Sequence, residues 1–232
     1  PAVPSQAGGS VRFELPGPLV VRLAELGRAR GASPFVVLLA GFQALLHRLS
    51  GAERFVVGTD VAGRPHPELA GLIGFFVNVL PIRARLDGAP SFAALIERVR
   101  EDVLAVFEHA TLPFDRIVDA LDIPRARARP PLVQALFVMQ NAPPGDFGVP
   151  GLAAEARAAS AHGSKFEMAL FLDPPAPGGG IAAEWVFATA LFTPERVARL
   201  AEAYATLLAA AAAAPAAPLP TLLPGLPDLL PA

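Results

Sequence analysis

The chain has 232 residues, of which 53% are hydrophobic and 17% are charged, a composition that suits a packed core of one large or two small domains and argues against disorder. Its 19 basic and 21 acidic side chains leave a formal net charge of −2, so no basic excess favours binding of nucleic acid or anionic lipid. The absence of cysteine excludes disulfides, thiolate metal sites and a cysteine nucleophile, and it fits a reducing cytoplasm.

The signals along the chain alternate between strand and helix. Residues 11–15 alternate apolar and polar side chains, and leucines at helical spacing follow until Gly31. The expected elements, in chain order, are a strand over 11–15, helices over 19–31 and 34–49, strands over 54–59 and 76–86, helices over 91–109 and 114–121, strands over 132–140, 152–158, 166–172 and 181–188, and a helix over 194–212. This interleaving predicts an α/β protein, a two-layer sandwich of helices on a mixed sheet.

Single residues at the ends of these elements sharpen the prediction. Ser33, Ser91 and Thr193 are expected to cap the helices that follow them, because their hydroxyls can accept a bond from an orphan amide of the first turn. Pro81 has no amide donor, which places its strand at a sheet edge or at a bulge. From Ala213 onward the composition is dominated by Ala, Pro and Leu, so we expect one folded unit over 1–212 and an interdomain linker over 213–232.

No segment is predicted to cross a membrane or to direct export. The apolar stretches 34–46 and 69–82 are shorter than the roughly 20 residues that a transmembrane helix needs, so we assign both to the core. The chain begins at Pro1 with neither a basic n-region nor a signal-type apolar segment, which indicates a fragment boundary. We therefore expect a cytoplasmic protein with no membrane partner.

The sequence offers no catalytic side chain and no metal site. Its histidines are His47, His66, His109 and His162, and no two are adjacent. Ser164 lies near His162, but no nucleophile elbow of the Gly-x-Ser-x-Gly kind surrounds it, so we expect no nucleophilic chemistry there. His109 is expected at a helix C-terminus, where a partly cationic imidazole is favoured. Metal-ligand spacing is also missing.

Four short blocks carry most of the functional information. They are residues 58–64 (GTDVAGR), 73–78 (IGFFVN), 112–115 (LPFD) and 131–141 (PLVQALFVMQN). In this order and at these separations they closely resemble the later conserved blocks of the condensation domains of nonribosomal peptide synthetases, which join two carrier-bound thioesters into an amide. That family's catalytic signature, HHxxxDG, is absent. The chain therefore resembles the C-terminal, chloramphenicol-acetyltransferase-like lobe of such a domain, without the lobe that carries the catalytic base.

The resemblance implies roles for particular residues. It assigns a loop that crosses between the lobes and floors the active-site tunnel to Gly58, Thr59, Asp60, Ala62, Gly63 and Arg64, and it makes Asn78 and Ser164 tunnel residues. The residues themselves leave alternatives open, because 58–64 also suits an ordinary strand-to-loop turn and Asn78 could satisfy a backbone irregularity near Pro81. For 112–115 and 131–141 we expect structural roles, as a helix start and a core strand.

The resemblance also implies partners. These are the N-terminal lobe of the same domain, donor and acceptor peptidyl carrier proteins whose phosphopantetheine arms enter the tunnel, and an adenylation domain beyond the linker; no cofactor would be bound directly. The strands over 166–190 are expected to bridge to the other lobe, exposing Leu170, Leu172, Trp185 and Phe187 when it is absent. Two alternatives are a non-catalytic relative that recruits a partner protein and a lobe of another acyltransferase that uses coenzyme A or a carrier.

Overall fold

The computed structural model describes residues 7–64, 66–69, 71–123, 129–140, 163–176 and 179–222. Its elements, in chain order, are β1(Gly8–Leu15), α1(Gly17–Arg28), α2(Pro34–Ser50), β2(Arg54–Val61), the 3₁₀ turn η1(Pro67–Leu69), β3(Asn78–Arg85), α3(Phe92–Phe107), α4(Phe114–Ala120), β4(Ala135–Met139), β5(Met168–Leu172), β6(Ile181–Ala188), α5(Pro194–Ala213) and α6(Leu219–Leu222).

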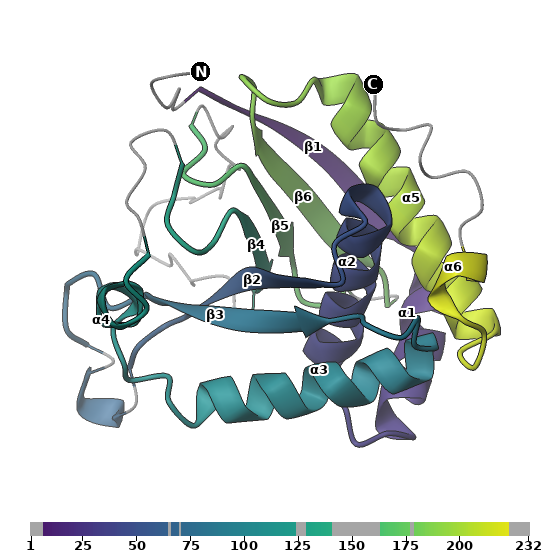
Figure 1. Cartoon of the computed structure of the whole chain (residues 1–232), viewed down its shortest axis with the longest axis horizontal. Coiled ribbons are helices and arrows are strands. Elements are labelled where there is room, and N and C mark those ends of the chain that lie inside the picture. The colour runs from purple at the N-terminus through teal and green to yellow at the C-terminus, as the bar shows by residue number, and fades with distance from the viewer. Residues whose placement is uncertain are drawn as a thin grey trace, which may run out of the picture.

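The strands form a mixed six-stranded sheet in the order β1-β6-β5-β4-β2-β3. β2, β4 and β5 are parallel to one another, whereas β3, β6 and β1 run antiparallel to their neighbours. β2 meets β4 through the pair Gly58 and Leu136, and the β2–β3 hairpin turns across the direction of the other strands (Figure 1). The predicted mixed sheet is thus confirmed, and Pro81 lies in β3 at the sheet edge as expected.

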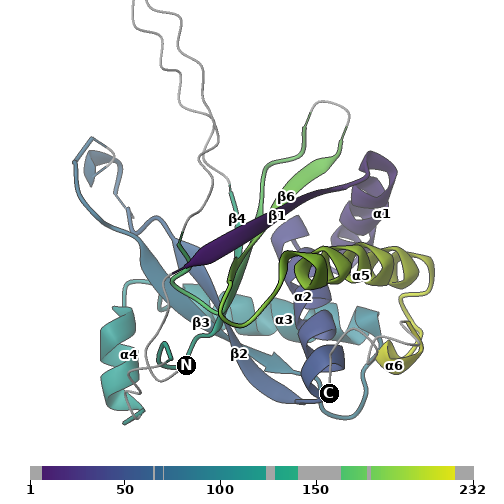
Figure 2. The same cartoon turned by 90° about the horizontal axis from the view of Figure 1, so that it is seen from above.

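The helices α1, α2, α3 and α5 gather on one face of the sheet (Figure 2). The main core lies between them and is rich in fully buried aromatic side chains, among them Phe42, Trp185 and Tyr204. The predicted caps are confirmed, because the hydroxyls of Ser33, Ser91 and Thr193 accept bonds from amides of the first helical turns. Each helix therefore begins where the sequence indicates, and this fixes how its apolar face meets the sheet.

The opposite face of the sheet carries a second, smaller apolar cluster. Its buried members are Val133, Leu136, Val138, Ala169 and Val186. Side chains alternate along β2, so that Val57 packs in the main core while Val56 contacts this second cluster. We call this side of the sheet, which α1, α2, α3 and α5 leave uncovered, the open face.

The expected apolar surface over 166–190 is absent, and this prediction is wrong. Leu170, Leu172, Trp185 and Phe187 are all 0% exposed. Their strands, β5 and β6, are interior strands paired on both sides, β5 with β4 and β6 with β1. Neither strand offers a free edge, and the bridging role of the pair stays a prediction.

Several element boundaries differ from the prediction. β3 begins at Asn78, two residues later than expected, and β4 begins at Ala135 because Leu132 takes a φ of 61° that no strand residue adopts. β1 begins earlier, at Gly8. The strand expected over 152–158 lies outside the described residues.

The chain stays in the fold beyond the boundary expected at residue 212. The amide of Ala93 donates to the carbonyl of Pro215, and the amide of Leu219 donates to that of Pro90. Leu219 and Leu222 of α6 are buried in the main core. Residues 213–222 are thus packed onto the lobe, because the two leucines of α6 bury their side chains in the main core. Residues 223–232 lie outside the described part, and a link to a further domain stays a prediction.

Candidate functional site

A long loop between β2 and β3, residues 62–77, projects from the body of the molecule (Figure 2). We call it the projecting loop. Of the residues predicted for a floor loop, Ala62, Gly63 and Arg64 begin it. Gly58, Thr59 and Asp60 instead lie in β2, paired with Pro81, Leu80 and Val79. The strand ends at Val61, two residues later than expected, and so includes Asp60.

Gly63 sits where the two ends of the projecting loop come together. Its φ is +61°, a left-handed conformation that costs a non-glycine residue about 1 kcal/mol or more. A Cβ on Gly63 would also overlap the carbonyl oxygen of Phe76. The base of the loop closes only because this position has no side chain.

Arg64 holds the loop from inside. Its guanidinium lies 4.2 Å above the centre of the Phe76 ring, a cation–π contact. The same group donates to the carbonyl of Leu72 at 2.9 Å and to the carbonyl of Leu69. With these contacts Arg64 joins the beginning, the middle and the end of the loop, so it acts as an internal brace and presents no free cation.

The braced loop exposes apolar side chains to water. Ile73 is fully exposed, Phe75 is 85% exposed, and Leu72 and Val77 are about half exposed. Contiguous exposed apolar side chains on a soluble protein usually mark a contact surface. The sequence assigned this stretch to the core, although Gly71 and Gly74 on either side of Ile73 were a signal for a loop.

Asn78 connects β3 to the turn between α3 and α4. Its Nδ2 donates to the carbonyls of Ala110 at 3.0 Å and Leu112 at 2.8 Å, and its Oδ1 accepts from the amide of Phe114 at 3.1 Å. The partners expected near Pro81 are not the ones it uses. Asn78 thereby fixes α4 beside the start of β3, at the foot of the projecting loop (Figure 1).

Ser164 lies elsewhere. It precedes β5, and because β2, β4 and β5 are parallel, the start of β5 is at the other end of the sheet from the loop that follows β2. The hydroxyl of Ser164 donates to the carbonyl of Phe166, a local turn contact. The structure therefore brings Asn78 and the projecting loop together but leaves Ser164 apart from them.

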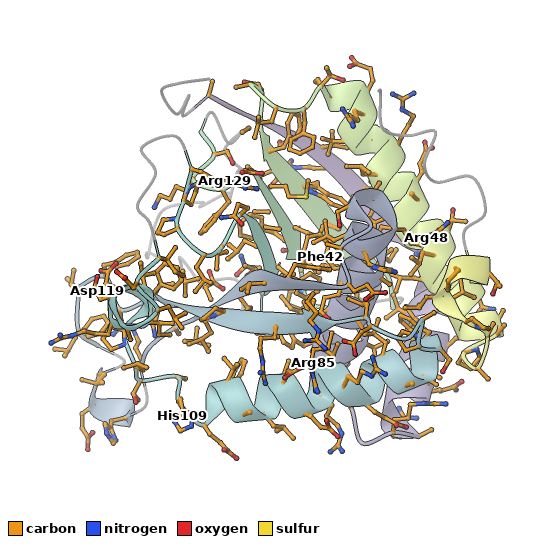
Figure 3. All side chains as sticks on the ribbon, viewed as in Figure 1. Phe42, Arg48, Arg85, His109, Asp119 and Arg129 are labelled. Carbon is orange, nitrogen blue, oxygen red and sulfur yellow. The ribbon has the colours of Figure 1, made fainter. Side chains whose placement is uncertain are left out.

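Three of the four histidines lie in the described part of the chain, and His66, which is exposed, lies in the projecting loop. His109 follows the end of α3 and is exposed, as predicted for a helix terminus (Figure 3). The Nδ1 of His47 lies 2.8 Å from the carbonyl of Ala52 just past α2, a helix-end contact. His162 lies outside the described part. In the described ranges no group of three or more His, Asp or Glu side chains could hold a metal ion, and no helix there is long and apolar enough to cross a membrane.

Arginines on and around the open face are paired. Arg83 and Arg85 of β3 bond to the buried carboxylate of Asp102 in α3, at 3.1 and 2.7 Å. Figure 3 shows Arg85 between β3 and α3, well away from the projecting loop. Arg129 pairs with Glu167 at 2.6 Å. These contacts stabilise the lobe, and among the described residues they leave the projecting loop, the Asn78 turn and the carboxylate of Asp60 as the candidate site.

Comparisons with known proteins agree on one family. The family model "Condensation domain" matches residues 1–224. Phosphinothricin tripeptide synthetase PhsB of Streptomyces viridochromogenes is 41% identical over 213 residues, which cover 90% of this chain and 18% of PhsB. The X-domain in the complex with OxyB from teicoplanin biosynthesis superposes with a TM-score of 0.86 at 26% identity, covering 100% of this chain and 50% of that one.

A third similar protein is the first condensation domain of the CDA synthetase. It superposes with a TM-score of 0.75 at 25% identity, over 92% of this chain and 47% of that one. The chain thus spans about half the length of these solved proteins and less than a fifth of PhsB.

Proposed function

Because the chain belongs to the condensation-domain family, we propose that it is the C-terminal half of a domain that joins two carrier-bound acyl groups through an amide bond. The observation that carries the proposal is the projecting loop. It is held in one shape by Gly63 and Arg64 while its apolar side chains face water. Exposed apolar side chains on a loop of fixed shape are expected where another part of the domain packs against the loop.

The relative lengths support this assignment. The solved relatives are about twice as long as this chain, which leaves room for a second half of similar size. Burying Ile73 and Phe75 against that half would remove more than 200 Å² of apolar surface from water, worth about 5 kcal/mol at 25 cal/mol per Å² before ordering costs. The loop would then cross to the other half and close the floor of a tunnel between the two.

The proposed reaction divides its work between the halves. The acceptor amine attacks the donor thioester carbonyl while a base takes a proton from the attacking nitrogen, and hydrogen-bond donors stabilise the tetrahedral oxyanion. The C–S bond then breaks, and the donor's phosphopantetheine sulfur leaves and takes up that proton as a thiol. The base would come from the other half, because the family's HHxxxDG signature does not occur in this sequence. This half would supply a tunnel wall, the floor loop and a surface for the donor and acceptor carrier proteins, whose phosphopantetheine arms deliver both acyl groups.

A second candidate has its own support. The X-domain that superposes on this chain was solved in a complex with OxyB, so one relative of this fold has a protein partner. A non-catalytic module that recruits a protein is therefore the alternative. Amide formation by the complete domain separates the two, since a recruiting module would form none.

The test of the proposal is reassembly from two halves. This chain, mixed with a separately expressed N-terminal half of the same domain, should form a one-to-one complex in analytical ultracentrifugation. Ile73→Asp should weaken the complex at least tenfold, since it puts a charge in an apolar contact. Leu191→Asp is the matched control, because Leu191 is an exposed leucine remote from the loop in sequence and outside the sheet. Equal weakening by both variants, or no complex with the parent chain, would contradict the proposal.

A further inference from the structure

Asp60 is a carboxylate in an unusual place. It lies in β2 directly opposite Val79 of β3, on the same side of the strand as Val56 and Gly58. Val56 and Val79 belong to the second apolar cluster, and a Cβ on Gly58 would meet the side chains of Val133 and Leu136 from that cluster. Asp60 therefore faces the open side of the sheet, two residues before the projecting loop starts.

The carboxylate has no counterion among the described residues. Arg12, Arg83 and Arg129 could serve the open face, but each is paired with another carboxylate, of Glu184, Asp102 and Glu167 respectively. Arg64, the nearest arginine in sequence, is engaged with Phe76 and with two carbonyls of its own loop. In the described part of the chain the side chain of Asp60 is thus left with its own backbone amide as a partner.

This position costs stability when Asp60 is ionised. Burial raises the pKa of the Asp60 carboxyl above its usual value, and the bond to its own amide offsets only part of that rise. A half-buried charge without a counterion is destabilising, and an uncharged residue of the same size would avoid the cost. A carboxylate that destabilises the fold at this position is better explained by a role in binding a ligand than by a role in folding.

We infer that Asp60 is a positioning residue that binds the protonated amine of the acceptor substrate. The inference deepens the proposed function and rests on it. An α-ammonium has a pKa of about 8, so the acceptor enters mainly as a cation and needs an anionic site. Asp60 lies on the face that would line the tunnel, at its floor. Before the attack the ammonium loses one proton to water; the base of the other half takes the second proton as the C–N bond forms, and Asp60 itself takes no proton.

The test compares two acceptors that differ in one group. Pantetheine thioesters of an α-amino acid and of the matching α-hydroxy acid bind to the complete domain, and their dissociation constants are measured by calorimetry. The parent should prefer the amino compound by about tenfold, the contribution of one hydrogen bond to a charged partner. Asp60→Asn should remove this preference and bind the hydroxy compound as the parent does. In turnover, the KM for the amino acceptor should rise while kcat changes less.

Asp122→Asn is the matched control. Asp122 is exposed and has a φ of 48°, a conformation that asparagine accepts as readily as aspartate, so this variant should keep the preference for the amino compound. An Asp60→Asn domain that still prefers the amino compound, or that weakens both compounds equally, overturns the inference. If the parent domain forms no amide at all, the proposed function fails and this inference fails with it; amide formation with an unchanged preference defeats the inference alone.

Discussion

Gly63 should tolerate no side chain, and three glycines of this chain make the reason testable. Gly63 combines a φ of +61° with an overlap between any Cβ and the Phe76 carbonyl. Gly51 has a similar φ of +69° but open space around it, and Gly71 has open space without a positive φ. Alanine at the three sites therefore separates backbone strain from steric overlap.

The expected losses follow from these differences. Gly71→Ala should change the free energy of unfolding by less than about 0.5 kcal/mol, as surface substitutions usually do. Gly51→Ala should cost about 1 kcal/mol, the penalty of a left-handed alanine. Gly63→Ala should cost about 2 to 3 kcal/mol, because either the Phe76 carbonyl must move or the left-handed turn must open. In a chain of 232 residues each kcal/mol lowers the melting temperature by about 2–4 °C.

Two measurements on the isolated chain check this series. Thermal unfolding followed by circular dichroism gives the ranking, and limited proteolysis with chymotrypsin reports the loop, since the exposed Phe75 offers a cleavage site in it. We expect Gly63→Ala to melt lowest and to be cut fastest after Phe75. In the complete domain Gly63→Leu should also lower turnover, through loss of the loop's shape. If Gly63→Ala melts and is cut like Gly71→Ala, the account of the loop base is refuted.

Three further variants test the surroundings of the loop. Asn78→Leu removes three hydrogen bonds and should cost about 2 kcal/mol, visible in urea unfolding; an unchanged midpoint would show that the α3–α4 turn does not depend on it. Arg64→Ala should speed chymotryptic cleavage after Phe75 with little loss of global stability, and a loop as resistant as the parent's would argue against the brace. Asp60→Asn should be at least as stable as the parent at pH 7, because it removes a desolvated charge. Because the pKa of Asp60 is raised in the folded state, the free energy of unfolding of the parent should rise relative to that of the variant as the pH falls through that pKa. A variant that is less stable than the parent at pH 7 would count against the assigned environment.

Local features of the fold could be predicted from the sequence because their causes are local. Ser33, Ser91 and Thr193 cap helices through bonds to amides three residues ahead, and Pro81 belongs at an edge for want of an amide donor. The four blocks likewise led to the family, which the relatives confirm.

What the sequence missed depends on distant partners. Asn78 bonds to residues 32 to 36 positions away, so its role could not be read from its neighbours. Phe76 alternates correctly for a strand but contacts Arg64 of the projecting loop, and β3 begins only at Asn78. The burial of Trp185 was missed because it depends on the strand order of the sheet, which places β6 between β1 and β5. That order is a property of the whole chain and cannot be read from one strand.

The central claim is that this lobe contributes to amide formation without holding the catalytic base. Mass spectrometry of intact carrier proteins tests it most directly, with donor and acceptor carriers loaded and mixed with this chain, with the N-terminal half, or with both. We expect the acceptor carrier to gain the mass of the donor acyl group only when both halves are present, and to stay unchanged with this chain alone. Product formed by this chain alone above the buffer rate, or no product with both halves assembled, would contradict the account.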